Sequence, residues 1–278
     1  MFVRRNHAAI EAVQTASFRD TSAEEMKPLY IEQNTFDIDR NQPVYRVVAE
    51  RFLTDDITCG RLTHTRIGKG TWLDNLENPL LDVEFLDQAT GGKLTLNGVV
   101  EDMFGVCWTE DSSDSELAWN NFSHSVPSVR IKSTPRKLMA AAMNLKDPFY
   151  MLHHYIGKVE YKEADAISES FGRQDFEQHL DSLGQGVVLS LMQLRTAVSV
   201  EREVRLVYSY MRDDNWVQQN VELSGDFCKI PFVWDGVIDE VVVGPLVADG
   251  GKARIKATMR GLNINCSIVG SIHRTNVG

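Results

Sequence analysis

Short strand-like runs recur along this chain and alternate only irregularly with helix-like segments. The run MFGVCWT at 103–109 is almost continuously apolar, which is typical of a strand in the middle of a sheet. The runs at 80–86 and 93–100 flank the turn QATGG and predict a hairpin, and a second hairpin is expected near residue 220. This pattern predicts an α+β fold with mixed, mainly antiparallel sheets and flanking helices.

Three segments carry clear helix signals. STPRKLMAAAMNL at 133–145 has Thr134 as a good N-cap and Pro135 at the first helical position. Ser113 and Glu116 have the spacing of a capping box and predict a helix start at that point. The third helix is GKARIKATMRG at 251–261.

The length of 278 residues fits one large domain with an N-terminal extension. Residues 5–18 are expected to form a short helix, and the polar stretch 19–42 is expected to be a linking arm. We therefore assign 1–42 to an N-terminal helix and arm, and 43–278 to a single α+β domain.

The formal net charge of −10 argues against tight, non-specific binding to a phosphate backbone, which usually needs a basic face. One local basic cluster lies within 251–261. The four cysteines lie far apart without zinc-type spacing, which favours reduced thiols in a cytoplasmic protein. No apolar run approaches membrane-spanning length and no signal peptide is recognised, so no membrane partner is expected.

The segment VEREVRLVYSY at 200–210 is a strand with unusually many charges. Because successive strand side chains point to opposite faces, Glu201, Glu203 and Arg205 are expected to share one face. That face has two interpretations. It either meets solvent with a weak ion pair between Arg205 and Glu203, or it presents a carboxylate pair to a cleft.

The adjacent His153 and His154 lie in YMLHHYIG, an aromatic-rich strand or loop, and are considered as metal ligands. Adjacent side chains on a strand face opposite ways, so the two imidazoles are not expected to share one ion. The sequence therefore predicts no metal site.

The segments CWTEDSSDSELAWNNFSHSVPSVRIKS (107–133), EREVRLV (201–207) and IDEVVVGPL (238–246) occur in the order seen in a bacterial family. The chain resembles the domain of unknown function 2971 over residues 43–272, best around Trp119, Glu203 and Gly244-Pro245. Members of that family are associated with phage defence and toxin-like modules, and the family name implies no activity.

A more distant resemblance implies chemistry. Tyr45-Arg46 on an early strand, Thr63-His64-Thr65 on the next, and Glu201-Arg202-Glu203 on a late strand follow the order of a known motif. The trio resembles ADP-ribosyltransferases of the Arg–Ser–Glu type, which implies a split sheet and NAD as the substrate.

The resemblance implies a role for each of these residues. Glu203 would face the positive charge that develops on the ribose as the nicotinamide bond breaks, and Glu201 would act as a general base. Arg46 would hold the NAD phosphates, because its planar fork matches phosphate geometry. Tyr45 would stack on nicotinamide, and Thr63 or Thr65 would brace the strand that carries the glutamate.

The function expected from these resemblances is NAD-dependent ADP-ribosyl transfer by a defence toxin, with a protein or nucleic-acid acceptor and an antitoxin partner. Two alternatives stay open. One is a non-enzymatic binding or sensor domain in which the charged strand serves the fold. The other is a metal-dependent nuclease that uses the acidic residues as metal ligands.

Overall fold

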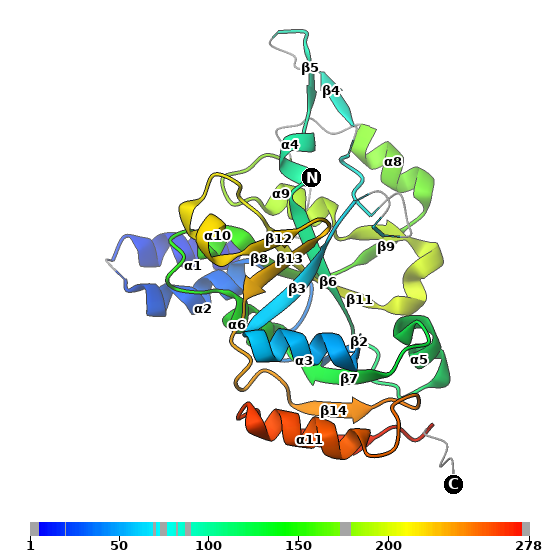
Figure 1. The fold of residues 1–278 in the computed structure, drawn as a ribbon. Helices are drawn as coiled ribbons and strands as arrows, with labels where there is room; N and C mark the ends of the chain where they lie inside the picture. The colour runs from blue at the N-terminus through cyan, green and yellow to red at the C-terminus, as the bar shows by residue number, and fades with distance from the viewer. Residues whose placement is uncertain are drawn as a thin grey trace.

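The structure is a computed structural model that describes residues 6–19, 21–68, 71–72, 77–81, 83–86, 90–172 and 179–273. A large sheet forms its centre and helices flank it (Figure 1). The strands of this sheet are, in chain order, β1 (Thr35–Phe36), β2 (Val44–Ala49), β3 (Arg61–Arg66), β6 (Met103–Thr109), β7 (Ser128–Ser133), β8 (His154–Lys158), β11 (Glu203–Ser209), β12 (Glu222–Ser224), β13 (Phe227–Pro231), β14 (Glu240–Val243) and β15 (Ser267–Gly270).

The strand order is β1-β8-β11-β6-β2-β7-β14-β15, and β3, β13 and β12 branch from β6. Among the described strand pairs of this sheet, β1–β8 and β14–β15 are parallel and the others are antiparallel, so the expected mixed and mainly antiparallel α+β fold is confirmed. Two smaller pairs complete the described strands: β4 (Glu84–Leu86) with β5 (Lys93–Thr95), and β9 (Glu160–Lys162) with β10 (Gln193–Arg195).

One edge of β6 is divided between two partners. Tyr45 of β2 pairs with Thr109 at one end of β6, and Thr65 of β3 pairs with Gly105 toward the other end. Between these points β2 and β3 diverge, so the sheet splits alongside Val106, Cys107 and Trp108. At the split, the middle of this central strand has no pairing partner on that edge among the described residues, and a site can form there.

The two faces of the sheet carry separate cores. Val204, Leu206 and Tyr208 of β11 belong to the larger core, and Val207 belongs to the smaller core on the other face. The two sets alternate along β11, as a two-residue period requires. The apolar half of the alternation expected at 200–210 is therefore present.

The helices are α1 (His7–Ser17), α2 (Ala23–Gln33), α3 (Glu50–Cys59), α4 (Asn97–Val100), α5 (Glu116–Ser123), α6 (Pro135–Ala142), α7 (Tyr150–His153), α8 (Ala164–Gly172), α9 (Gln185–Ser190), α10 (Asn215–Asn220) and α11 (Gly251–Gly261). Local sequence signals correctly predicted two of these helices, α6 and α11. The Thr134 hydroxyl accepts from Lys137 N at the start of α6, and α11 has the predicted bounds. At the start of α5 the cap is Ser115 rather than Ser113, because the Ser115 hydroxyl accepts from Ala118 N.

The segment 19–42 is not a linking arm. It contains α2, which starts at a capping box formed by Ser22 and Glu25, and β1, which pairs with β8. The polar composition of this segment suggested an exposed arm, but several of its polar side chains are buried and hydrogen-bonded within the fold. Asn34, for example, is fully buried and donates to the carbonyls of Met151 and His154.

The segment 200–210 also differs from expectation at its start. Thr196–Glu201 form a 3₁₀ helix, and Arg202 adopts a left-handed conformation with φ of 46° before β11 begins at Glu203. Glu201 therefore does not lie on the strand, although it remains next to it.

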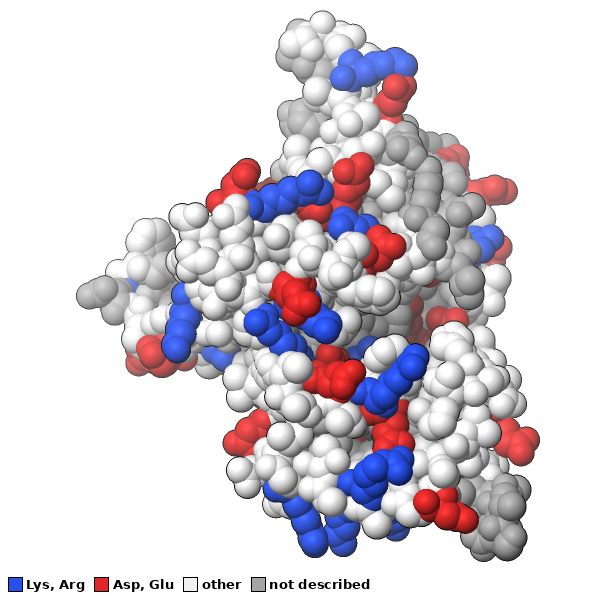
Figure 2. All heavy atoms as spheres, in the orientation of Figure 1, with Lys and Arg blue, Asp and Glu red and all other residues white. Residues whose placement is uncertain are grey.

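Basic and acidic side chains are intermixed on the face shown in Figure 2, without a large patch of one sign. In α11, Arg254 of the basic cluster pairs with Glu50 of α3 at 2.7 Å. Among the described residues, none of the helices has the length and apolar character needed to cross a bilayer. All four cysteines are free thiols.

Candidate functional site

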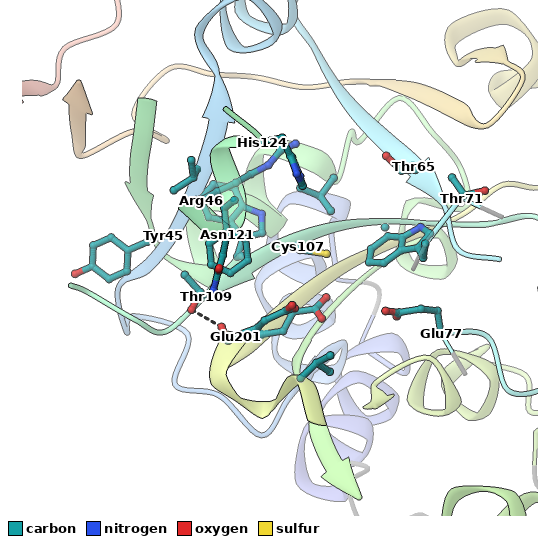
Figure 3. A pocket seen from close by; sticks show the side chains of 18 residues that line it. Tyr45, Arg46, Thr65, Thr71, Glu77, Cys107, Thr109, Asn121, His124 and Glu201 are labelled. Carbon is teal, nitrogen blue, oxygen red and sulfur yellow. Dashed lines mark hydrogen bonds between the residues drawn. The ribbon is translucent and has the colours of Figure 1, made fainter. Parts of the chain in front are cut away.

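A pocket of about 410 Å³ opens at the split in the sheet (Figure 3). Its floor is the middle of β6, from Gly105 to Thr109, and β2 lines one side. Glu201 and Glu203 lie on another side, and Asn121, Phe122 and His124 of the α5 region form a wall. A pocket of this size is within the usual range for small-molecule sites.

The pocket brings together Arg46, Tyr45, Thr65, Glu201 and Glu203 from three distant parts of the sequence. Thr63 is not among its lining residues. The Thr63 hydroxyl and backbone N–H are instead bound to the Asp56 carboxylate on α3. The structure therefore places five of the six predicted site residues around one cavity.

Glu203 is held by a buried ion-pair network. Arg205 donates from Nε to one Glu203 oxygen at 2.8 Å and from Nη2 to the other at 3.0 Å. The same guanidinium donates to Glu77 at 2.7 Å and to the Leu191 carbonyl at 2.6 Å. Because Glu203 is only 2% exposed and Arg205 is fully buried, the solvent-facing interpretation of this strand is wrong.

Trp72 covers the outer side of this network. The Arg205 guanidinium lies 4.8 Å from the centre of the Trp72 ring, an arrangement that favours a cation–π interaction. The indole N–H is bound to the Arg66 carbonyl, which fixes the ring orientation. Trp72 and Glu77 both line the pocket, so the network forms part of its surface.

Glu201 has a different environment from Glu203. Its backbone carbonyl accepts from the Thr109 hydroxyl at 2.6 Å, which anchors the end of the 3₁₀ helix to β6 (Figure 3). Burial and the neighbouring charges of Glu203 and Glu77 raise the pKa of Glu201 to about 7. A carboxyl group that titrates near neutral pH can accept and release a proton under physiological conditions.

Arg46 supplies positive charge on the opposite side of the pocket. Its Nη1 atom is buried and has no hydrogen-bond partner among the described residues. Burial lowers the pKa of Arg46 while the nearby Asp56 carboxylate raises it, and an arginine stays charged under such conditions. A buried guanidinium nitrogen without a partner is costly, and an anionic ligand would relieve that cost.

Tyr45 contributes less to the cavity than its position in the motif implies. Its ring points away from the other labelled side chains in Figure 3 and lies under Arg130, whose guanidinium is 5.2 Å from the ring centre. Thr65 lies on the pocket side of β3 beside Thr71. The aromatic rings available inside the pocket are those of Trp72, Trp108 and Phe122.

The end of α5 carries two consecutive residues in a rarely used backbone conformation. His124 and Ser125 have φ values of 48° and 59°, and neither is glycine. Such a conformation costs free energy, and it persists where the surrounding structure requires it. Here it ends α5 so that Asn121, Phe122 and the exposed His124 border the pocket.

Cys107 lies on the pocket floor but is not set up as a nucleophile. Burial, reinforced by the charge of Glu203, raises the pKa of its thiol well above the ordinary value. The thiol form is unreactive, since nucleophilic cysteines depend on the thiolate.

Sequence reasoning missed several pocket residues. Glu77 and Trp72 lie in a stretch without a recognisable motif, and the sequence pattern predicts Phe122 to be a core residue of a helix. The ion pair between Arg205 and Glu203 was expected and is confirmed. Its extension to Glu77 has no local signal, because the two residues are 128 positions apart.

Comparison with known proteins gives no match to any family model and none to a curated protein. Among solved structures, this chain is similar to DarT from Thermus sp. 2.9 in complex with carba-NAD⁺, at 10% identity and a TM-score of 0.35, over 85% of this chain and 98% of that chain. It is similar to the same protein in complex with NAD⁺, at 11% identity and a TM-score of 0.33, over 84% and 96% of the two chains. The complex of that protein with ADP-ribosylated single-stranded DNA matches at 10% identity and a TM-score of 0.36, over 83% and 94%.

Proposed function

We propose that this chain is an NAD-dependent ADP-ribosyltransferase that uses the pocket at the split of the sheet. One observation carries the proposal. The same cavity of about 410 Å³ is lined by two carboxylates with different environments and by an arginine whose buried Nη1 has no hydrogen-bond partner in the part of the chain that the structure describes. A dinucleotide with an anionic pyrophosphate and a ribose that becomes cationic during cleavage matches both kinds of charge.

Arg46 is the residue that binds the NAD pyrophosphate. A charge-assisted hydrogen bond from its Nη1 to a phosphate oxygen satisfies a group that has no hydrogen-bond partner among the described residues. Trp72 and Phe122 provide flat apolar surfaces on which a nicotinamide or adenine ring can stack. These two rings replace Tyr45, whose ring points away from the other labelled pocket residues in Figure 3.

Glu203 is the residue that stabilises the transition state. When the bond between ribose C1′ and the nicotinamide nitrogen breaks, its electron pair leaves with nicotinamide and the ribose gains oxocarbenium character. A fixed carboxylate in a site with little water stabilises this charge more than it stabilises bound NAD. Arg205 donates hydrogen bonds to both Glu203 oxygens and thus serves as a positioning residue.

Glu201 is the general base. The nucleophile of the acceptor attacks C1′ and passes its proton to the Glu201 carboxylate. A base with a pKa of about 7 is matched to this role, because it is largely ionised just above neutral pH and still takes up a proton readily. The acceptor class that we propose is a protein or a nucleic acid, as expected for a toxin that an antitoxin partner restrains.

The test is incubation of the full chain with labelled NAD and with single-stranded DNA, RNA or bacterial protein as acceptor. We expect label transfer by the wild-type chain and a loss of at least 100-fold in Glu203→Gln. Arg46→Met is expected to raise the KM for NAD with a smaller effect on kcat, because it removes a binding contact that persists throughout the reaction.

Matched controls separate these roles from general effects of charge removal. Glu222→Gln on the exposed strand β12 and Arg51→Met on the exposed side of α3 should retain wild-type transfer. Transfer that persists in Glu203→Gln would remove Glu203 from the reaction. The absence of transfer and of NAD hydrolysis with every acceptor would favour a binding domain, and metal-dependent cleavage of the nucleic acid would favour a nuclease.

A further inference from the structure

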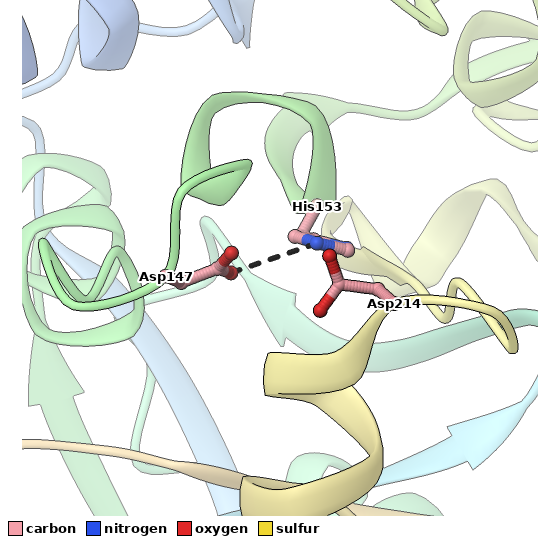
Figure 4. A group of neighbouring side chains, drawn as sticks. All are labelled: Asp147, His153 and Asp214. Atoms are coloured by element: carbon pink, nitrogen blue, oxygen red, sulfur yellow. Dashed lines mark ion pairs between the residues drawn. The ribbon is translucent and has the colours of Figure 1, made fainter.

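A second cluster of chemically active side chains lies apart from the pocket. Asp147, His153 and Asp214 each offer one ligand atom, and these three atoms lie within 4.8 Å of one another (Figure 4). Asp147 is 1% exposed and His153 is fully buried, whereas Asp214 is half-buried. None of the three lines the pocket at the split.

The hydrogen bond of His153 defines which ring nitrogen carries a proton. Its Nδ1 lies 2.7 Å from the Ser209 carbonyl oxygen, which can only accept, so Nδ1 is the donor. In the neutral ring, Nε2 is then left with a lone pair. That lone pair faces the cluster, and a backbone carbonyl on the other nitrogen is the usual partner of a metal-bound histidine.

Two of the ligand atoms have no hydrogen-bond partner among the described residues. Asp147 Oδ2 and His153 Nε2 are both buried and face each other at 3.5 Å. The other Asp147 oxygen already accepts from Phe149 N at 2.9 Å, so the unpaired atom is the one directed at the cluster. Buried polar atoms of this kind normally have partners, and two of them converge on one point here.

We propose that Asp147, His153 and Asp214 form a binding site for a divalent transition-metal ion such as Zn²⁺. One imidazole nitrogen and two carboxylate oxygens are a ligand set that suits Zn²⁺ or Mn²⁺ better than Mg²⁺ or Ca²⁺, which prefer oxygen ligands. Bonds of about 2.1 Å would bring the ligand atoms to separations of roughly 3.4 Å. Asp214 is the least buried of the three and its other oxygen caps α10 by accepting from Val217 N, so it can make most of this adjustment.

The electrostatics of the cluster favour a cation. The carboxylates of Asp147 and Asp214 lie close together beside the His153 imidazole, and their two negative charges attract a cation. A bound divalent ion balances the negative charges of both carboxylates at once. A single proton shared by Asp147 and His153 balances only one of them. The ion would also join three segments: the loop before α7, the junction of α7 with β8, and the start of α10.

The sequence predicts no metal site at His153 and His154, because adjacent side chains on a strand point to opposite faces. The cluster contains His153 but not His154. The partners of His153 are Asp147, in the loop before α7, and Asp214, at the start of α10. No known metal-binding motif has this spacing, so the sequence did not predict the cluster.

Calorimetric titration of the chelator-treated full chain with Zn²⁺ tests the site. We expect one ion to bind the wild-type chain and to raise its Tm, because a ligand that binds only the folded state stabilises that state. Asp214→Asn should weaken binding by tenfold or more and abolish the rise in Tm. This substitution keeps an oxygen that can cap α10, so the helix start is preserved.

Asp213→Asn is the matched control, because Asp213 is the exposed neighbour of Asp214. It should bind Zn²⁺ like the wild type. His153→Gln should also lose binding, and if this variant does not fold, Asp214→Asn gives the answer. Co²⁺ in place of Zn²⁺ should give only the weak absorption of nitrogen and oxygen coordination.

The outcomes are distinct. Binding that is absent from the wild-type chain, or equal in Asp214→Asn and the wild type, overturns the proposal and leaves Asp147 and His153 as an ion pair. A strong thiolate-to-cobalt charge-transfer band places the ion on cysteines and also overturns it. Neither result depends on NAD, so the proposed transferase activity is tested separately.

Discussion

Glu201 and Glu203 show how two carboxylates that are two residues apart acquire different properties. Glu203 lies on β11, and both of its carboxylate oxygens accept hydrogen bonds from the Arg205 guanidinium, one from Nε and one from Nη2. Glu201 lies at the end of a 3₁₀ helix, where burial and like charges act on it without such a partner among the described residues. Separation of environments in this way is how enzymes assign different tasks to similar groups.

The raised pKa of Glu201 predicts a specific dependence of stability on pH. In the folded chain its pKa is about 7 and its ordinary value is 4.5, so the folded state binds the proton more tightly than the unfolded state. The wild-type free energy of unfolding therefore falls as pH rises from 4.5 to 7, and Glu201→Gln lacks this loss. We expect the variant to gain about 1 to 2 kcal/mol relative to the wild type between pH 4.5 and 8, after allowance for partial exposure.

Urea denaturation of both proteins at several pH values measures this difference. Glu222→Gln, an exposed glutamate on β12, serves as the control and should follow the wild-type pH curve. Parallel curves for Glu201→Gln and the wild type would show that Glu201 titrates normally in the folded chain.

At the scale of elements, the divergence of β2 and β3 creates the pocket, and tight packing elsewhere holds it in place. Trp119 of α5 is buried, and its ring packs against Gly244 immediately after β14. Gly244 also donates from its backbone N–H to the Ser128 carbonyl at 3.0 Å. The contact between Trp119 and Gly244 thus fixes the helix that forms one wall of the pocket.

Gly244→Ala should disrupt that contact. A Cβ at this position would lie 2.5 Å from the Ser128 carbonyl oxygen and 2.7 Å from the Trp119 ring, and a backbone oxygen cannot move aside cheaply. We expect a loss of about 1 to 3 kcal/mol in the free energy of unfolding, measured by chemical denaturation. Gly270→Ala in β15, where a Cβ meets nothing within 4 Å, is the control and should be close to neutral. Equal stability of the two variants would mean that the α5 wall tolerates displacement.

At the scale of the whole molecule, the N-terminal segment is built into the large sheet. β1 adds to β8, Phe36 is fully buried in the smaller core, and Ile31 is buried in the larger one. Buried Gln185 of α9 donates to the Gln33 carbonyl at 3.1 Å, which links the segment to the elements near Arg205. Residues that precede the expected boundary at 43 therefore contribute to both cores.

Removal of residues 1–36 should destabilise the chain by an amount on the order of 5 kcal/mol, because several apolar side chains lose their burial and β8 gains an open edge. Removal of residues 1–17, which takes away α1 and leaves β1 in place, should cost much less. Thermal unfolding of both truncated chains measures the difference. Similar Tm values for the two would show that β1 adds little to the sheet.

The sequence alone determined the features that depend on near neighbours. The N-cap of α6, the extent of α11, the apolar run of β6 and the alternation along β11 could all be predicted, because a helix turn or a strand pleat is set by residues a few positions apart. The same alternation showed that Glu203 and Arg205 share a face.

Only the tertiary structure decided what covers that face. Glu77, Trp72 and the Leu191 carbonyl reach Arg205 from distant segments, and Arg46 reaches the same pocket from β2. Asp147, His153 and Asp214 likewise meet only after β8, β11 and α10 have packed. Chain neighbours fix which side chains point the same way, but the environment that tunes their charge comes from contacts far apart in sequence.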